Sequence, residues 1–307
     1  ERHDLPPDRV TLGNGSNDVL VLLAEAFLEP GLEAVYSRYA FAVYAIAVQA
    51  AGATARIAPA LDWDSPMPLG HDLDKMAEAI GPQTRLVFVA NPNNPTGSIY
   101  SKTELKELAK ICRAYQIIVI SDEIYHGLVY EGRAHSILEF TDNAFVLNGF
   151  SKKYAMTGWR VGYAVAPKSV IDEMEKLMEH MVSGVTAMAQ RAALAAITGP
   201  QTCVEEMLKA YDRRRRIVYE GLNAIEGISC LMPASTFYAF PNIKKLGMSS
   251  WDLAKFLVKE HKVALVPGSI FGRNGEGYLR LSFAVSSEQL IEGLRRIKTG
   301  VEKIDKS

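Results

Sequence analysis

The chain has 307 residues, of which 48% are hydrophobic and 22% are charged. This composition excludes a disordered or fibrous protein, and the length predicts two domains. The chain has 34 basic and 35 acidic residues and a net charge of −1. It therefore lacks the positive charge that nucleic-acid binders need, and a small-molecule ligand is favoured.

The sequence contains no obvious membrane or export segment. Its longest apolar run, residues 39–48, has about half of the roughly 20 residues that a membrane-spanning helix needs. The first residues are polar and lack the apolar stretch of a signal peptide. Three cysteines, Cys112, Cys203 and Cys230, are widely spaced and odd in number, which argues against a disulfide framework or a zinc site. We therefore expect a cytoplasmic protein with no metal, no membrane partner and no nucleic-acid partner.

Strands and helices alternate through the first two thirds of the chain. A strand at 10–12 leads through a glycine turn into an apolar helix at 19–28, and a further helix is expected at 103–115. Other apolar, β-branched runs predict strands at 34–36, 86–90, 117–121, 145–147 and 161–165. This alternation predicts an α/β protein with three layers, in which helices cover both faces of a mostly parallel sheet. Ligands of such sheets bind at the carboxyl ends of the strands.

The pattern changes after a long predicted helix near residues 203–225, and short strands follow at 236–239 and 278–283. We predict a large domain at 1–205 and a smaller α+β domain at 206–307. The helix contains four consecutive arginines, residues 213–216. Since the chain is neutral overall, we interpret this run as a solvated helix face rather than a nucleic-acid patch.

Two glycine- or proline-rich turns follow predicted strands. Residues 13–17, Gly-Asn-Gly-Ser-Asn, end a strand and open a helix, where free amides favour an anion such as phosphate. Their spacing matches neither the dinucleotide fingerprint nor the P-loop, so a plain turn with an N-cap serine is the alternative. Residues 91–97, Asn-Pro-Asn-Asn-Pro-Thr-Gly, hold asparagine amides in a rigid loop where they can donate to an oxygen anion.

Two further motifs carry ionisable groups. Asp122 and Tyr125 come just past a predicted strand, where a carboxylate is costly to bury unless a cation meets it. Lys152 follows another strand, and Arg160 precedes the next. A lysine close to cationic groups in a dry pocket becomes a nucleophile able to form Schiff bases, and an arginine fork suits a phosphate.

Together these motifs resemble the fold type I pyridoxal-phosphate enzymes, specifically the class I/II aminotransferases. The resemblance rests on Asn-Pro-Thr-Gly at 94–97, Asp-Glu-x-Tyr at 122–125 and Ser-Lys-x-x-x-x-x-Gly-x-Arg-x-Gly at 151–162. These motifs occur in the family's order and spacing. The similarity covers nearly the whole chain.

The resemblance implies a role for each motif residue. Lys152 would form the Schiff base with pyridoxal 5'-phosphate and move the substrate's α-proton, and Asp122 would pair with the pyridine nitrogen. Asn94 and Tyr125 would bind the cofactor's 3′-oxygen. Arg280 would bind the substrate's α-carboxylate, and Asn94 is also expected to contact the substrate. The residues implied around the cofactor phosphate are Gly15, Ser16, Asn17, Ser151 and Arg160.

Several of these residues have simpler alternative interpretations. Phe41 aligns with the aromatic residue that stacks on the cofactor ring, but it lies in an apolar segment and could be core, with Tyr39 and Tyr44 as rivals. Tyr125 could be a packed phenol. Arg280 could be an exposed charge at the rim of the sheet.

The two halves of the sequence suggest different substrates. Residues 10–96 look most like histidinol-phosphate aminotransferases, whereas the chain from Asp122 onward is more similar to aspartate and aromatic aminotransferases. We predict transfer of an amino group from an L-amino acid to a 2-oxo acid, 2-oxoglutarate, by a ping-pong Schiff-base mechanism. A histidinol-phosphate aminotransferase of histidine biosynthesis is the alternative.

The resemblance also implies a homodimer, because the family's active site lies between subunits. Relatives carry an additional N-terminal segment before the equivalent of Glu1, which supplies part of their small domain. Two alternatives remain: an enzyme that catalyses another pyridoxal-phosphate reaction, and a catalytically impaired cofactor-binding protein.

Overall fold

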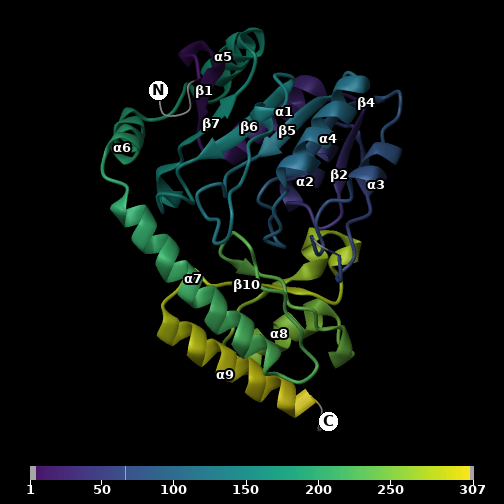
Figure 1. Ribbon diagram of the computed structural model, residues 1–307, viewed down its shortest axis with the longest axis vertical. Helices are drawn as coiled ribbons and strands as arrows, with labels where there is room; N and C mark the ends of the chain where they lie inside the picture. The colour runs from purple at the N-terminus through teal and green to yellow at the C-terminus, as the bar shows by residue number, and fades with distance from the viewer. Residues whose placement is uncertain (1–4, 66, 305–307) are drawn as a thin grey trace.

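The computed structural model describes residues 5–65 and 67–304, which form a larger part built on one sheet and a smaller part built on another (Figure 1). The larger sheet has the strand order β1-β7-β6-β5-β4-β2-β3. Its strands are β1 (Val10–Gly13), β2 (Glu33–Ser37), β3 (Thr54–Ala58), β4 (Thr84–Ala90), β5 (Ile118–Asp122), β6 (Ala144–Gly149) and β7 (Gly162–Val165). Neighbouring strands pair in parallel from β3 through to β6, and only β7 runs antiparallel to its neighbours β1 and β6.

Helices cover both faces of this sheet. They are α1 (Ser16–Phe27), α2 (Ala42–Ala50), α3 (Leu73–Glu78), α4 (Lys102–Ala114), α5 (Lys168–Val182) and α6 (Ala187–Thr198). One apolar core joins α1, α2 and α5 to the sheet, and another joins α3 and α4 to it. The central strands are buried on both sides, which is why they read as continuous apolar runs. The predicted three-layer α/β fold is therefore confirmed.

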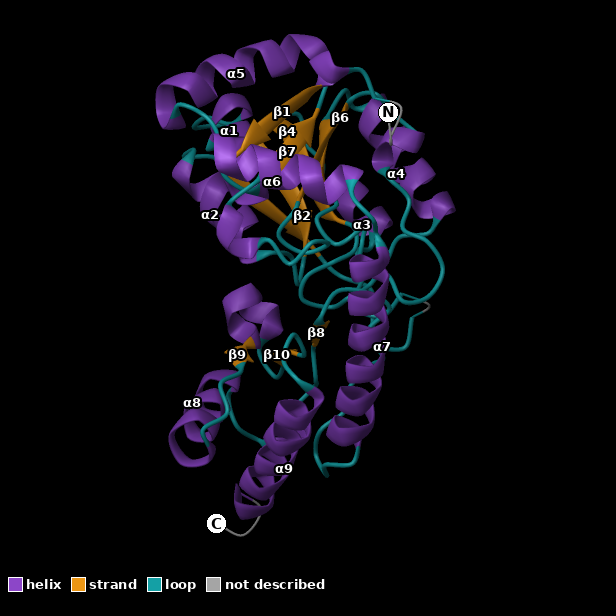
Figure 2. Cartoon of the chain, turned by 90° about the vertical axis from the view of Figure 1, so that its left-hand side faces the viewer, coloured by secondary structure: helices purple, strands orange, loops and turns teal. Residues whose placement is uncertain are grey.

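The smaller part contains α7 (Thr202–Asn223), α8 (Ser250–His261) and α9 (Ser287–Ile304). Its antiparallel sheet has the order β8-β10-β9, with β8 (Tyr238–Ala239), β9 (Val266–Pro267) and β10 (Leu279–Ser282). Short 3-10 helices lie at Pro7–Arg9, Ile137–Glu139, Thr157–Trp159, Lys244–Leu246, Gly268–Phe271 and Arg273–Gly275. Figure 2 shows α7 extending from the larger part alongside the smaller one.

The sequence did not predict β3 as a strand. Only Ala58 is buried in it, because β3 pairs on one side with β2 and forms an edge of the sheet. An edge strand needs few apolar side chains, so it lacks the pattern from which the buried strands were predicted.

The interpretation of residues 213–216 as a solvated face is wrong for Arg215. Arg213 and Arg216 are exposed, but the side chain of Arg215 is 1% exposed. Four consecutive residues make more than a full turn of an α-helix, so they cannot all face solvent. Arg215 is the member of the run that faces inward.

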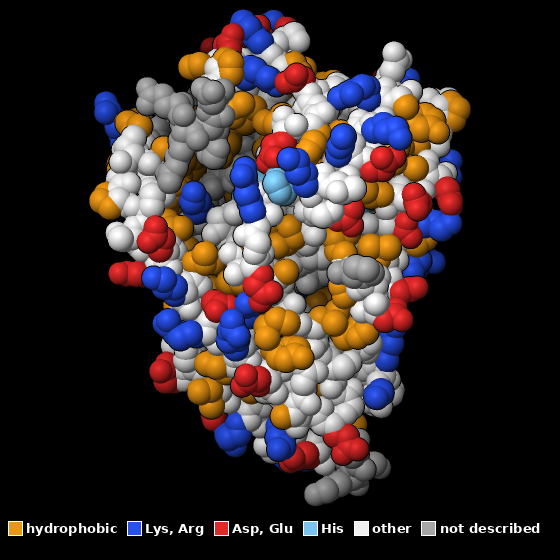
Figure 3. All heavy atoms as spheres, viewed as in Figure 1, with side chains coloured by type: hydrophobic (Ala, Val, Ile, Leu, Met, Phe, Trp, Pro, Cys, Tyr) orange, Lys and Arg blue, Asp and Glu red, His pale blue; other side chains and the backbone are white. Residues whose placement is uncertain are grey.

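Figure 3 shows acidic and basic side chains intermingled over one face of the molecule, in keeping with the balanced charge of the chain. Among residues 5–65 and 67–304, no helix combines the length and the apolar character needed to span a membrane.

Candidate active site

A cavity of about 230 Å³ lies beyond the carboxyl ends of the central parallel strands, where β10 of the smaller part also contributes. All the predicted site residues except Gly15 line it: Ser16, Asn17, Phe41, Asn94, Asp122, Tyr125, Ser151, Lys152, Arg160 and Arg280. The other lining residues are Ala90, Pro92, Ile124, Thr157 and Tyr238. The topology thus brings segments from both ends of the chain to one site.

Asp122 supplies a buried carboxyl group to this cavity from the end of β5. Its Oδ1 accepts a hydrogen bond from the Ile124 amide at 3.2 Å. Burial raises the pKa of Asp122 to about 6, although the Ile124 amide, the Lys152 charge and the Tyr44 hydroxyl oppose that rise. A cation placed beside this carboxyl group would therefore favour its ionised form.

The next residue, Glu123, is also buried but does not line the cavity. Its Oε1 accepts hydrogen bonds from the hydroxyls of Ser121 and Ser136 and from the Ile137 amide, each at 3.0 Å. Burial raises the pKa of Glu123 to about 8. Glu123 directly follows the last residue of β5, and successive side chains of an extended chain point to opposite sides, so the carboxyl groups of Asp122 and Glu123 have different neighbours.

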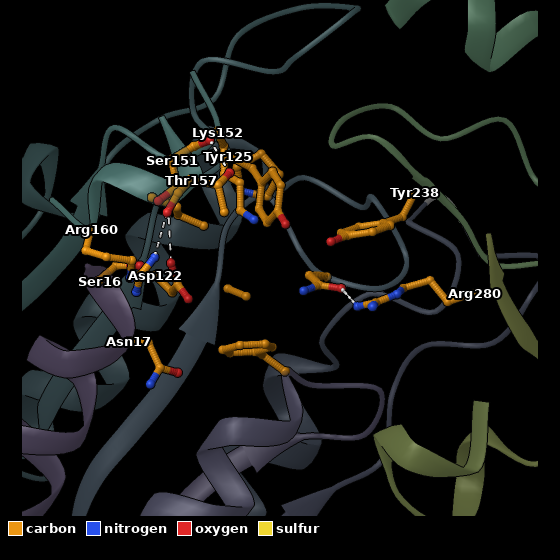
Figure 4. A pocket seen from close by; sticks show the side chains of 15 residues that line it. Ser16, Asn17, Asp122, Tyr125, Ser151, Lys152, Thr157, Arg160, Tyr238 and Arg280 are labelled. Atoms are coloured by element: carbon orange, nitrogen blue, oxygen red, sulfur yellow. Dashed lines mark hydrogen bonds between the residues drawn. The ribbon is translucent and has the colours of Figure 1, made fainter. Parts of the chain in front are cut away.

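Lys152 follows β6 and lies close to aromatic rings. Its Nζ is 5.7 Å from the centroid of the Tyr125 ring and 5.4 Å from that of Phe237. Figure 4 shows Lys152, Ser151 and Tyr125 gathered at one side of the cavity. This places a primary amine within the electrostatic reach of Asp122.

The N-terminus of α1 forms one end of the cavity. Gly15 is its N-cap with φ of +100°, and within the described residues no side chain caps this end. Ser16 and Asn17 begin the helix, and the guanidinium of Arg160 lies beside Ser16 (Figure 4). A cation next to uncapped helix amides is a suitable site for a phosphate.

Two glycines at this end of the cavity are tightly packed against their neighbours. A Cβ atom on Gly15 would lie 2.3 Å from Nη2 of Arg160, and one on Gly162 would lie 2.2 Å from the Ser16 nitrogen. Arg160 is itself fixed by donating to the carbonyl oxygens of Asn14 and Thr157, both at 3.0 Å. Glycine is therefore required at position 162, where a Cβ would meet backbone atoms, and is favoured at position 15, where φ is +100°.

Arg280 lies at the opposite end of the cavity (Figure 4). Its Cζ is 4.2 Å from the centroid of the Tyr238 ring and 4.9 Å from that of Phe271. Its Nη1 donates to Oδ1 of Asn94 at 3.0 Å. Arg280 is thus packed and hydrogen-bonded inside the site, and the alternative of an exposed rim charge is wrong.

The three aromatic candidates near α2 have different surroundings. Phe41 lines the cavity, whereas Tyr44 is fully buried and stacks on Phe88 with centroids 5.0 Å apart. Tyr39 packs edge-on against Phe240 at 5.9 Å. Of the three, only Phe41 is in position to face a ligand in the described cavity.

The sequence motifs missed two polar lining residues, Thr157 and Tyr238. Thr157 falls on an unspecified position of the 151–162 motif, so only its place inside that motif could have pointed to it. Tyr238 lies on β8 of the smaller part, and no local pattern indicates which distant segment it meets.

Comparisons with known proteins agree with this geometry. The family described as Aminotransferase class I and II matches residues 1–297. The chain is 37% identical to an aspartate aminotransferase of Pyrococcus horikoshii and to a probable aspartate/prephenate aminotransferase of Aquifex aeolicus, covering 97% of this chain and 77% of each relative. The crystal structure of an aromatic aminotransferase from Pyrococcus horikoshii OT3 matches with a TM-score of 0.92 at 34% identity, covering 97% of this chain and 80% of that one.

The chain belongs to the class I and II aminotransferase family. It is a pyridoxal-phosphate-dependent transaminase of fold type I, so the predicted family and enzyme class are confirmed.

Proposed function

We propose that the cavity holds pyridoxal 5'-phosphate, with Lys152, Asp122 and Tyr125 as its catalytic residues. When bound, this cofactor supplies an electron sink that stabilises negative charge on the substrate's α-carbon. The observation that carries the proposal is the buried Asp122 carboxyl group between an amine at Lys152 and an uncapped helix end beside Arg160.

The residues present fit the distinct chemical groups of this cofactor. The ionised form of Asp122 would gain from a protonated ring nitrogen, because burial otherwise disfavours its charge. The helix end at Ser16 and Asn17, with Arg160, suits a phosphate. An amine at Lys152 suits an aldehyde.

Each side chain then has a defined task. Lys152 would hold the cofactor through its amine and would accept the proton from the substrate's α-carbon. Asp122 would stabilise a protonated ring nitrogen, and Tyr125 and Asn94 would hold the ring through its 3′-oxygen. Phe41, which lines the cavity, would stack on the ring. The residues that would hold the phosphate are Gly15, Ser16, Asn17, Ser151 and Arg160.

Arg280 gives the site its preference for an acid. Its guanidinium can bind a carboxylate through two parallel hydrogen bonds. The 3.0 Å hydrogen bond from its Nη1 to Oδ1 of Asn94 orients the guanidinium. Relatives named as aspartate, aromatic and aspartate/prephenate aminotransferases support an L-amino acid as donor. We propose 2-oxoglutarate as the acceptor, in a ping-pong reaction.

The surroundings of the site support a homodimer. Trp159, Met188 and Leu194 are 51%, 77% and 54% exposed, and they line grooves that adjoin Arg160 and Phe150. Apolar side chains exposed in this way favour contact with a second subunit. Three free cysteines support a reducing cytoplasmic location.

We propose a domain boundary near residue 205. Met207 and Leu208 of α7 already pack against the apolar core of the smaller part. The large domain would then comprise residues 1–205 and the small one residues 206–307.

The test compares Lys152→Ala with the matched control Lys153→Ala. Each purified protein is mixed with pyridoxal 5'-phosphate, reduced with borohydride and digested, and mass spectrometry locates the attached cofactor. We expect attachment at Lys152 in the wild type and in Lys153→Ala, and none at this site in Lys152→Ala. Attachment at Lys153 in the wild type would refute the assignment.

Substrate choice is tested on the loaded wild type. L-aspartate, L-phenylalanine and histidinol phosphate are compared as donors by the conversion of the visible absorbance of the bound cofactor. Conversion by either amino acid supports the proposal, and conversion by histidinol phosphate alone favours the alternative substrate. If none of the three donors changes the absorbance of the bound cofactor, the chain is a catalytically impaired cofactor-binding protein.

A further inference from the structure

Arg215 is the buried member of the arginine run on α7, and its contacts join distant parts of the chain. Its Nε donates to Asp212 at 2.6 Å, and its Nη1 donates to the carbonyl of Pro233 at 2.8 Å. Its Nη2 donates to Glu131 at 2.8 Å, and its Cζ lies 4.6 Å from the centroid of the Tyr130 ring. Because a buried guanidinium needs partners for its N–H groups, these contacts fix α7 against both the loop after β5 and the segment that begins at Pro233.

That segment, residues 233–238, is here named the strap, and the loop after β5 holds it. The Tyr130 amide donates to the Ala234 carbonyl at 3.1 Å, and the Thr236 amide donates to the Leu128 carbonyl at 2.9 Å. The Tyr130 hydroxyl donates to the Thr236 carbonyl. Thr236 has φ of +66°, a conformation that β-branched residues rarely adopt and that persists only where surrounding contacts hold it.

The end of the strap forms one wall of the active site. The centroid of the Phe237 ring is 5.4 Å from Nζ of Lys152. The centroid of the Tyr238 ring is 4.2 Å from Cζ of Arg280. Two residues of the strap therefore contact the amine and the guanidinium on which the proposed reaction depends.

The middle of the strap also reaches the loop that carries Asn94. The buried hydroxyl of Ser235 donates to the Gly97 carbonyl at 2.8 Å. Asn94, three positions before Gly97, accepts the hydrogen bond from Arg280. The strap thus contacts Arg280 through Tyr238 and the loop that carries Asn94 through Ser235.

We propose that Arg215 is a positioning residue for the substrate-carboxylate site, acting through the strap. This inference rests on the proposed function of Arg280. Arg215 touches neither the cavity nor Arg280 directly, and it controls where the strap begins. Loosening it should displace Tyr238 and Ser235, and with them the guanidinium that binds the carboxylate.

The experiment compares Arg215→Lys with Arg213→Lys, the same substitution at an exposed position two residues earlier on α7. Lysine keeps the charge but cannot make the several directed contacts of the guanidinium. For loaded Arg215→Lys we expect KM for L-aspartate and 2-oxoglutarate to rise about tenfold, less than the roughly hundredfold effect of a 1 Å misplacement. We expect kcat to change by about twofold or less, because ground-state and transition-state binding fall together. L-phenylalanine replaces L-aspartate if aspartate is not a donor.

Hydrogen exchange of cofactor-free protein supplies a readout independent of activity. Amides of peptides covering residues 233–238 should exchange at least about tenfold faster in Arg215→Lys than in the wild type or in Arg213→Lys. Faster exchange would show that Arg215 holds the strap even if the wild type transfers no amino group, whereas the absence of transfer would refute the proposed function on which the inference rests.

A purely structural role would lower the melting temperature of Arg215→Lys but leave KM and strap exchange unchanged, and that result overturns the inference. If Arg215→Lys does not fold, Tyr130→Phe carries the test, because it keeps the ring under Arg215 and removes only the hydroxyl bond to Thr236. Wild-type KM and exchange in Tyr130→Phe would then overturn the inference.

Discussion

Substitution of Asp122 by asparagine separates the cost of a buried charge from its use in catalysis. Asp122 is 8% exposed, and burial raises its pKa from 3.8 to about 6. An asparagine would still accept the hydrogen bond from the Ile124 amide, but it would not ionise. The cofactor-free variant should therefore be more stable than the wild type at neutral pH.

The size of this gain follows from the pKa of Asp122 in the two states. Well below pH 3.8 both the folded and the unfolded protein carry a protonated Asp122, so its charge has no cost. As the pH rises to about 6 the unfolded chain releases the proton first, and the folded state loses relative stability. A rise in pKa from 3.8 to about 6 corresponds to about 3 kcal/mol, which is fully lost above the folded-state pKa.

The assay is urea denaturation of cofactor-free protein at pH 4, 6 and 8. Asp142→Asn is the matched control, because the Asp142 side chain is 90% exposed and its surface ion pair with Arg9 contributes about 1 kcal/mol or less. The difference in unfolding free energy between Asp122→Asn and the wild type should grow by about 2 kcal/mol from pH 4 to pH 8, because the unfolded chain has already lost part of its proton at pH 4. Asp142→Asn gives the baseline for the loss of a surface carboxylate.

The loaded enzyme should show the opposite preference. With the cofactor present, wild-type Asp122 gains a cationic partner, whereas Asp122→Asn should transfer amino groups at least about a hundredfold more slowly. The reasoning would be refuted by a variant whose relative stability does not depend on pH. Wild-type turnover of the loaded variant would refute the proposed role of Asp122.

Two further substitutions test the ends of the cavity. Arg280→Lys should raise KM for the amino acid by about tenfold or more with a smaller change in kcat, because lysine cannot bind a carboxylate through two parallel hydrogen bonds. Steady-state kinetics measure this, and an unchanged KM would contradict it. Gly162→Ala should weaken cofactor binding by at least about tenfold, about 1.4 kcal/mol, because the new Cβ would lie 2.2 Å from the Ser16 nitrogen. Equilibrium dialysis with pyridoxal 5'-phosphate measures this, and Gly158→Ala, whose Cβ meets no described atom within 4 Å, should bind like the wild type.

Much of the fold and of the candidate site could be predicted from the sequence. Buried parallel strands need continuous apolar runs, so β4, β5 and β6 stand out against the helices between them. Residues that follow such strands, including Asp122 and Lys152, must lie at one edge of the sheet, because parallel strands end there. The roles suggested for these residues came from the resemblance to a family, and the spacing of the motifs carried that resemblance.

Only the tertiary structure decided which residues meet across long separations in the chain. The contact between Arg280 and Asn94 spans 186 positions, and the contact between Arg215 and Glu131 spans 84. Tyr238 enters the site from the smaller part for the same reason. Local patterns report how a segment folds and which face it buries, but the partner of a buried polar group depends on how separate segments pack. For that reason four adjacent arginines look alike in the sequence, although one of them lies buried behind the wall of the active site.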